Sequence, residues 1–67
     1  MKYKLNLNIL NLAMLNKGYS ITKLSELSGV SKASISRLMK ETHESRAETI
    51  YKIAKVLDIE SEDLLQK

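Results

Sequence analysis

The chain has 67 residues, of which 43% are hydrophobic and 28% charged, and its formal net charge is +3. This length allows one small domain and cannot supply the walls of a deep pocket, so many enzyme architectures are excluded. The absence of Cys excludes disulfides, thiolate metal sites and cysteine nucleophiles. No Pro and only two Gly favour helices with short connections, and the fold class that we expect is all-α.

Positive charge is concentrated in the first 40 residues. Residues 1–40 carry seven Lys or Arg and one Glu, a formal charge of +6, whereas residues 41–67 carry four Lys or Arg and seven Asp or Glu, a charge of −3. The basic part suits a polyanionic partner, although an ordinary solvated surface can show the same excess. No stretch approaches the ~20 apolar residues of a membrane span, and no signal peptide is recognisable, so we expect a cytoplasmic protein with no membrane partner.

Five short helices can be placed along the chain. The first covers about residues 8–17, where Asn6 or Asn8 can cap its start and Gly18 can supply the left-handed residue that ends it. Its predicted apolar stripe consists of Leu10, Ala13 and Met14.

The second and third helices are separated by a short turn. The second starts after Ser20 and ends at Gly29, and the third starts after Ser31 and runs to about Lys40. The inner side of the second helix carries Leu24, Ser25, Leu27 and Ser28. The apolar stripe of the third helix consists of Ile35, Leu38 and Met39.

The polar residues 41–45 are predicted as a loop that leads to a fourth helix over about residues 46–57. The apolar residues of this helix have near-ideal helical spacing and are Ala47, Ile50, Ile53, Ala54 and Leu57. A turn at Asp58 and Ile59 then precedes a last short helix, for which Ser61 is the expected cap. This helix contains Leu64 and Leu65.

Residues 3–9 allow more than one interpretation. Four apolar residues alternate there with Lys and Asn, which is strand periodicity, and they are Tyr3, Leu5, Leu7 and Ile9. A single strand has no partner in an all-helical chain, so it would pair with its copy in a second subunit as a two-stranded ribbon. A frayed or helical N-terminus is the alternative, because chain termini are often poorly ordered.

Residues 20–38, with the sequence SITKLSELSGVSKASISRL, have the spacing of a helix-turn-helix. The small Ser25 allows the two helices to cross closely, and Gly29, four residues later, can take the positive φ that the turn requires. Ile35 and Leu38 then anchor the second helix of the pair against the first.

These residues resemble the helix-turn-helix of the Cro and phage-repressor type, which is common in small bacterial and phage regulators. The resemblance covers about residues 8–65 and is strongest in LSELSGVSKASISRL, residues 24–38. The segment TIYKIAKVLDI, residues 49–59, and the following Asp63, Leu64 and Leu65 are similar to the family's fourth and fifth helices.

The resemblance implies a compact, lambda-repressor-like bundle of about five helices, with residues 1–67 as a single DNA-binding domain and the helix-turn-helix at about 21–40. Some positions depart from the family pattern. Ile21 stands where the family often has a phosphate-binding Gln, Ser25 where Ala is usual, Lys40 and Glu41 where Asn-Gly is usual, and Leu12 and Leu15 where the family is often polar.

In this family the third helix enters the major groove of double-stranded DNA, which exposes a distinct pattern of donors and acceptors for each base pair. At the matching positions, the residues expected to face base edges are Lys32, Ala33, Ser36 and Arg37. The expected phosphate contacts, which position the protein without reading sequence, are Ser20, Thr22, Lys23, Ser31, Ser34, Lys40, Thr42 and His43.

The function that we expect is a sequence-specific transcriptional regulator, a repressor acting as a homodimer. The candidate dimer interface consists of Tyr3, Leu5, Leu7, Leu12 and Leu15. A protein-interaction module on the same fold, such as an antirepressor or an antitoxin-like partner, is the alternative. We expect no enzyme, because no acid–base pair, metal set or phosphate-binding Gly loop is present. We also expect no cofactor, metal or small-molecule ligand, and His43 has no second His or Cys beside it.

Overall fold

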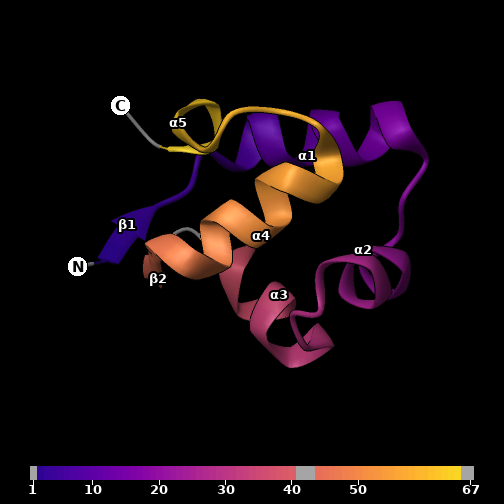
Figure 1. The fold of residues 1–67 in the computed structure, drawn as a ribbon, viewed down its shortest axis with the longest axis horizontal. Helices are drawn as coiled ribbons and strands as arrows, with labels where there is room; N and C mark the ends of the chain where they lie inside the picture. Colours follow the sequence, from indigo (N-terminus) through magenta and orange to yellow (C-terminus); the bar gives the residue numbers. More distant parts are fainter. Residues whose placement is uncertain (1, 41–43, 66–67) are drawn as a thin grey trace.

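The computed structural model describes residues 2–40 and 44–65, and within these residues it contains five helices and one two-stranded ribbon. In chain order the elements are β1 (Lys2–Lys4), α1 (Leu7–Lys17), α2 (Ile21–Ser28), α3 (Lys32–Leu38), β2 (Glu44–Arg46), α4 (Ala47–Leu57) and α5 (Ser61–Leu64) (Figure 1). The expected helical bundle is confirmed, and the ribbon is added to it.

The first helix is bounded by its own local sequence. The side-chain oxygen of Asn6 accepts hydrogen bonds from the backbone N–H groups of Asn8 at 3.1 Å and Ile9 at 3.3 Å. These bonds satisfy two of the N–H groups that the start of a helix leaves unpaired. Gly18 ends the helix with φ +71°, a conformation that costs glycine little. Of the two candidate caps, the structure therefore selects Asn6.

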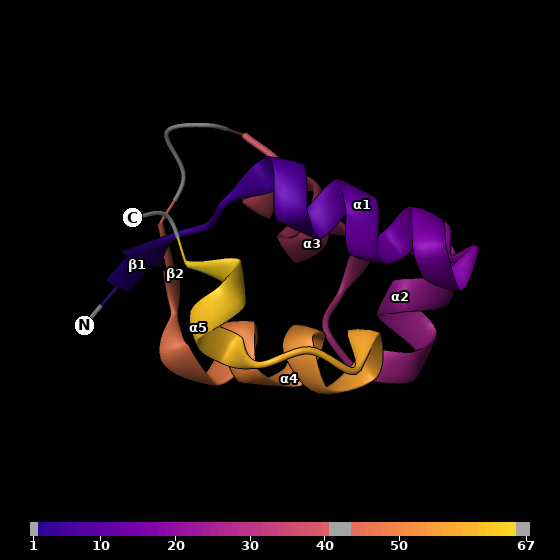
Figure 2. The same ribbon diagram turned by 90° about the horizontal axis from the view of Figure 1, so that it is seen from above.

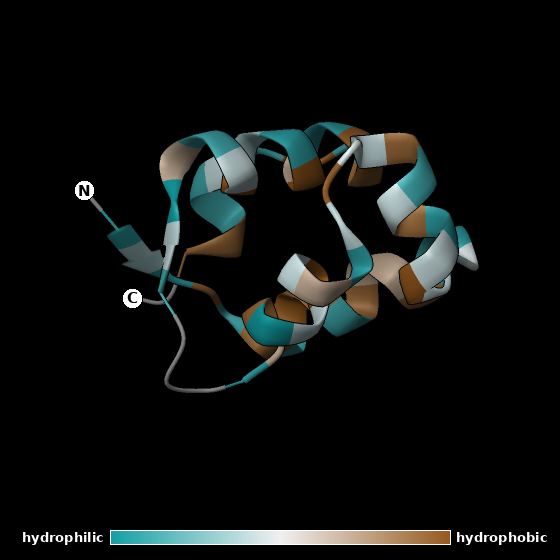
Figure 3. Cartoon of the chain, turned by 90° about the horizontal axis from the view of Figure 1, so that it is seen from below, coloured by the Kyte–Doolittle hydropathy of each residue, from teal (hydrophilic) through white to brown (hydrophobic). Residues whose placement is uncertain are grey.

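In the view of Figure 1, α4 runs between α1 and α5 above it and α2 and α3 below it, and the view from above shows α4 along one edge of the molecule, opposite α1 (Figure 2). The view from above shows α5 beside the β1–β2 ribbon and α2 at the opposite end (Figure 2). The most deeply buried side chains come from every helix and are Leu10, Leu24, Ile35, Ile50, Ile53, Leu57 and Leu64. The helices carry both hydrophobic and hydrophilic segments (Figure 3). Burial is one-sided in α4, most of whose apolar residues face the core, whereas α1 also exposes Leu12 and Leu15.

The predicted core is correct except at its edges. Leu27, placed by its spacing on the inner side of α2, is 46% exposed, and Ala47 is also exposed. Helical periodicity fixes the direction of the apolar stripe, but the width of the stripe depends on which helices pack against it. Met39 is only half-buried, and α3 ends at Leu38 rather than at about Lys40.

The N-terminal strand finds its partner within the chain. β1 pairs antiparallel with β2, with Lys2 opposite Arg46, Tyr3 opposite Ser45 and Lys4 opposite Glu44. Pairing with a second subunit, one of the interpretations of residues 3–9, is therefore wrong, and so is a frayed or helical start for residues 2–4. The helical alternative is correct for residues 7–9, because α1 begins at Leu7. Part of the predicted loop at 41–45 is strand as well. Three polar residues carry no strand signal of their own, so this pairing could not be read from local sequence.

Leu5 joins the two ends of the chain. It forms an antiparallel bridge with Leu65, and the next residue, Asn6, donates its backbone N–H to the carbonyl of Leu64 at 2.7 Å. Leu5 is 7% exposed and belongs to the hydrophobic core. Its assignment to a dimer interface is consequently wrong, because its side chain is already buried within the chain.

The last turn and helix differ slightly from the prediction. Asp58 ends α4 in the left-handed conformation, with φ 60°. Glu60, not Ser61, holds the cap position of α5, and its side chain makes no capping hydrogen bond. Ser61 is instead the first helical residue, and Leu64 anchors the helix in the core.

Candidate nucleic-acid interface

The helix-turn-helix consists of α2, a turn at residues 29–31 and α3. The Ser20 Oγ caps α2 by accepting a hydrogen bond from the backbone N–H of Lys23 at 3.2 Å. Gly29 ends α2 with φ +77°, which confirms the predicted turn residue. The start and the end of α2 are therefore both set by residues that the sequence singles out.

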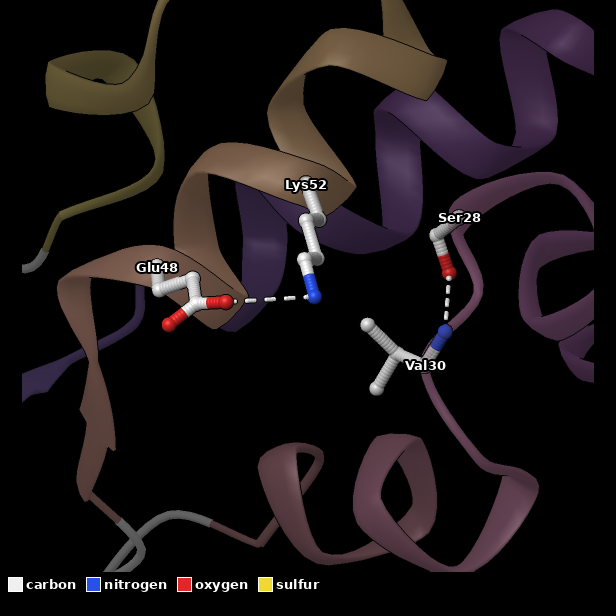
Figure 4. Close-up of polar contacts among 4 residues, drawn as sticks. All are labelled: Ser28, Val30, Glu48 and Lys52. Carbon is white, nitrogen blue, oxygen red and sulfur yellow. Dashed lines mark hydrogen bonds and ion pairs between the residues drawn. The ribbon is translucent and has the colours of Figure 1, made fainter.

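Two serines of α2 bind the same residue of the turn. The Ser25 hydroxyl donates a 2.7 Å hydrogen bond to the carbonyl of Val30. The Ser28 hydroxyl accepts one of 3.1 Å from the Val30 N–H (Figure 4). Because Val30 is buried, its backbone groups need protein partners. These bonds fix the turn and with it the angle at which α3 leaves α2. From the sequence spacing we expected Ser25 to act only as a small residue that lets the two helices cross closely.

Figure 4 also shows an ion pair on α4, between Lys52 and Glu48 at 3.3 Å. The residues are one helical turn apart, and both side chains are largely exposed. Exposed pairs of this kind contribute less than about 1 kcal/mol. The pair therefore has little effect on the fold and lies outside the helix-turn-helix.

Helix α3 presents one face to the core and the other to solvent. Its start is capped by Ser31, whose Oγ accepts from the Ser34 N–H at 3.2 Å and donates to the Ser34 Oγ at 3.0 Å. Ile35 and Leu38 are buried. The four candidate base-reading residues are all exposed and are Lys32, Ala33, Ser36 and Arg37. At 100° per residue they span an arc of about 140° on the side away from the core.

The candidate phosphate contacts lie at the ends of the two helices. Ser20, Thr22 and Lys23 are exposed at the start of α2, Ser31 is exposed and Ser34 half-buried at the start of α3, and Lys40 is exposed beyond the end of α3. Thr42 and His43 lie outside the described residues. The described candidates thus lie at the starts of α2 and α3 and just past the C-terminal end of α3.

The remaining dimer candidates are divided between two environments. Tyr3 in β1 and Leu7 in α1 are half-buried and pack against the core. Leu12 and Leu15 of α1 are 58% and 75% exposed. Leu12 also lines a shallow hollow between α1 and the end of α4, together with Ile9, Leu57 and Ile59. Of the five candidates, Leu12 and Leu15 offer apolar surface to a partner.

Two cationic residues beside α3 were missed by the sequence reasoning. Lys2 of β1 and Arg46 of β2 line one polar pocket with Arg37 of α3. Their placement depends on the β1–β2 pairing, and the only signal for it was the alternation in residues 3–9. Among residues 2–40 and 44–65, no group of three or more His, Cys, Asp or Glu could hold a metal ion, and no helix is long and apolar enough to cross a membrane.

The family comparison agrees with this geometry. Residues 10–64 match the model of a helix-turn-helix family, that of the Cro and phage-repressor type. The chain belongs to this family, whose members are DNA-binding transcription regulators. No curated protein and no solved structure matches the chain significantly.

Proposed function

We propose that the chain is a sequence-specific repressor that binds double-stranded DNA as a homodimer, with α3 in the major groove. The observation that carries the proposal is the exposed face of α3. Four residues suited to base contacts, Lys32, Ala33, Ser36 and Arg37, lie opposite the buried Ile35 and Leu38. A helix that is anchored on one side and exposed on the other can enter a groove that is about 12 Å wide.

Each side chain on this face suits a different part of a base pair. Arg37 can donate two hydrogen bonds to guanine, which is worth about 1–3 kcal/mol of discrimination against other bases. Lys32 can reach guanine or a phosphate, and the methyl group of Ala33 can contact a thymine methyl. Ser36 can donate or accept, so it suits any base edge within reach.

Hydroxyls at the helix starts are proposed phosphate donors. The Ser20 oxygen accepts from Lys23 N–H, which leaves the hydroxyl proton for a phosphate oxygen. The Ser31 proton is used in the bond to Ser34, so Ser34 is the better donor of these two. Thr22, Lys23 and Lys40 add exposed groups beside them. These contacts would position α3 without reading sequence.

The small size of one module favours dimerisation. A single module of this kind buries only about 600–1,000 Å² on DNA, and two copies on half-sites about 34–36 Å apart would provide useful affinity. The exposed Leu12 and Leu15 on α1 provide the apolar surface for the contact between copies. Residues 1–67 would act as one DNA-binding unit in each copy.

A protein-interaction module is the second candidate function. The same two leucines favour it, because large exposed apolar side chains suit a protein partner as well as a second copy. Such a protein would bind its partner tightly and DNA weakly.

The test is selection of bound duplexes from a random DNA pool at near-physiological salt, with the fold of the protein checked by circular dichroism. Enrichment of a two-fold-symmetric motif supports the site-specific homodimer. A short asymmetric motif would retain base reading and refute the homodimer. Binding without enrichment would leave only sequence-independent electrostatic binding. A folded protein that binds no duplex would favour the interaction module.

A further inference from the structure

A polar pocket of about 350 Å³ lies between α3 and the β1–β2 ribbon. Three cationic residues line it, Lys2 of β1, Arg46 of β2 and Arg37 of α3. Three hydroxyl residues line it as well, Ser34, Ser45 and Thr49. Among residues 2–40 and 44–65, Glu44 is the one acidic residue that lines this pocket, so the described lining carries an excess of positive charge.

The ribbon places two of these cations directly opposite each other. Lys2 pairs with Arg46, whereas the neighbouring pair, Lys4 and Glu44, joins opposite charges. Like charges in directly opposite positions of an antiparallel pair are destabilising. Among the described residues, Lys52 and Glu48 form the one ion pair within 4 Å. No carboxylate of the described residues therefore lies within 4 Å of the charged groups of Lys2, Arg37 or Arg46. An anion bound beside Lys2 and Arg46 would relieve their repulsion.

Ser45 gives a second, independent indication of a ligand. It is 5% exposed, and its hydroxyl oxygen has no hydrogen-bond partner among the residues that the structure describes. Buried hydroxyls are normally paired, because burying one without a partner destabilises the protein. Ser45 is among the residues that line the cationic pocket, and its hydroxyl is buried on the inner face of β2. A small local opening of the pocket would bring an acceptor bound there to this unpaired donor.

We propose that this pocket binds one phosphate group of the DNA backbone, with Lys2 and Arg46 supplying positive charge and Ser45 a hydroxyl donor. The inference rests on the proposed function, because it assumes that α3 is in the major groove. Arg37 and Ser34 stand at one edge of the exposed face of α3 and also line the pocket. A phosphate at this edge would fix the register of α3 and involve the N-terminal strand in DNA binding.

The test compares Lys2→Ala and Arg46→Ala with Lys4→Ala. Lys4 lies in the same three-residue strand and is exposed, but it does not line the pocket, so its variant loses the same charge at a matched control position. Affinity is measured by fluorescence anisotropy, over a range of salt concentrations, for the duplex selected by the wild type and for an unrelated duplex. Unfolding curves confirm that each variant is folded.

Lys2→Ala and Arg46→Ala are each expected to weaken binding of both duplexes by about fivefold at 0.15 M salt and to lower the slope of log affinity against log salt by about 0.9. Lys4→Ala should leave the slope nearly unchanged. Equal losses for all three variants would mean that only overall charge matters and would overturn the pocket. A wild type that is folded and binds no DNA would refute the proposed function itself, before any variant is compared.

Two further measurements address the hydroxyl and the source of the phosphate. Ser45→Ala is expected to weaken DNA binding without lowering the free energy of unfolding, and an unchanged affinity would overturn the role of the hydroxyl. Titration with inorganic phosphate, followed by the amide signals of Lys2 and Ser45 in NMR spectra, should show no saturation below millimolar concentrations. Tight binding of inorganic phosphate would assign the pocket to a free phosphate ligand and overturn the DNA contact.

Discussion

The hydroxyl of Ser25 donates a 2.7 Å hydrogen bond to the backbone carbonyl of Val30, linking the middle of α2 to the residue that precedes the cap of α3. In related helix-turn-helix proteins this position of α2 usually holds Ala, which is only small. In this chain the residue is also small, but it binds the turn as well. The orientation of α3 therefore depends on a side-chain hydrogen bond and not only on packing.

Ser25→Ala is expected to lower the free energy of unfolding by about 1 kcal/mol, because it removes the bond to the Val30 carbonyl without creating a large cavity. In a protein of this size, that loss corresponds to a fall in Tm of about 4–8 °C. The measurement is urea denaturation followed by circular dichroism. Ser36→Ala is the matched control, because Ser36 is exposed on α3 and the same substitution there removes no hydrogen bond that holds the turn. Equal stability of the two variants would contradict a structural role for the Ser25 hydroxyl.

The backbone conformation of Gly29 can be tested by substitution without a steric clash. Its φ is +77°, and a Cβ added to it would meet no atom within 4 Å. Gly29→Ala should therefore lower the free energy of unfolding by about 1–2 kcal/mol through backbone conformation alone. Gly29→Asn is expected to lie between Ala and the wild type, because Asn adopts the left-handed conformation more readily than Ala. Thermal unfolding of the three proteins distinguishes the causes, since equal losses for Ala and Asn would indicate a steric conflict.

Much of the helical fold could be predicted because its signals are local. Asn6, Ser20 and Ser31 accept hydrogen bonds from the first turns of α1, α2 and α3, and Gly18 and Gly29 end α1 and α2. Each of these interactions joins residues only a few positions apart in the chain. Helical spacing then gave most of the core, because a residue's direction around a helix follows from its position.

The ribbon could not be predicted in the same way, because it pairs residues about 40 positions apart in the chain. The sequence of β2, ESR, is polar and too short for an alternating pattern. The alternation in residues 3–9 indicated a strand at the N-terminus but not its partner. For the same reason Leu5 could not be recognised as a core residue, since its burial depends on the bridge to Leu65.

The candidate site likewise has one part that the sequence predicts and one part that it does not. The exposed face of α3 follows from helical spacing and from the family resemblance, and the structure confirms that its four residues are exposed. Whether they read bases stays a prediction. The cationic pocket beside Arg37 combines side chains from β1, β2, α3 and α4, so no single stretch of sequence could indicate it.

Arg37 and Lys23 are predicted to differ in the kind of DNA contact they make. Arg37→Ala should lose about 1–3 kcal/mol of discrimination at one base pair of the selected site, because a bidentate contact to guanine is removed. Lys23→Ala should weaken all duplexes by about the same factor, because a phosphate contact carries no sequence information. The measurement is affinity for the selected duplex and for its single-base-pair variants. A uniform loss for Arg37→Ala would reassign Arg37 to the phosphate backbone.

Leu12 and Leu15 are predicted to mediate self-association. Replacing both with Gln should lower the fraction of dimer in sedimentation equilibrium while leaving the unfolding of the monomer nearly unchanged, because these side chains are 58% and 75% exposed within one chain. Leu27→Gln is a useful control, since Leu27 is also a substantially exposed leucine but lies on α2.

The DNA-binding curves of the double variant and the wild type distinguish the DNA-binding homodimer from the protein-interaction module. If α1 joins the copies, the double variant should bind an isolated half-site as the wild type does and lose affinity for the full two-fold-symmetric site. The difference arises because two linked copies bind adjacent half-sites at a high effective concentration, whereas unlinked copies bind independently. Dimers that survive the double substitution would place the interface elsewhere. If the wild type is monomeric at all concentrations, Leu12 and Leu15 would be assigned to an interface with a different protein.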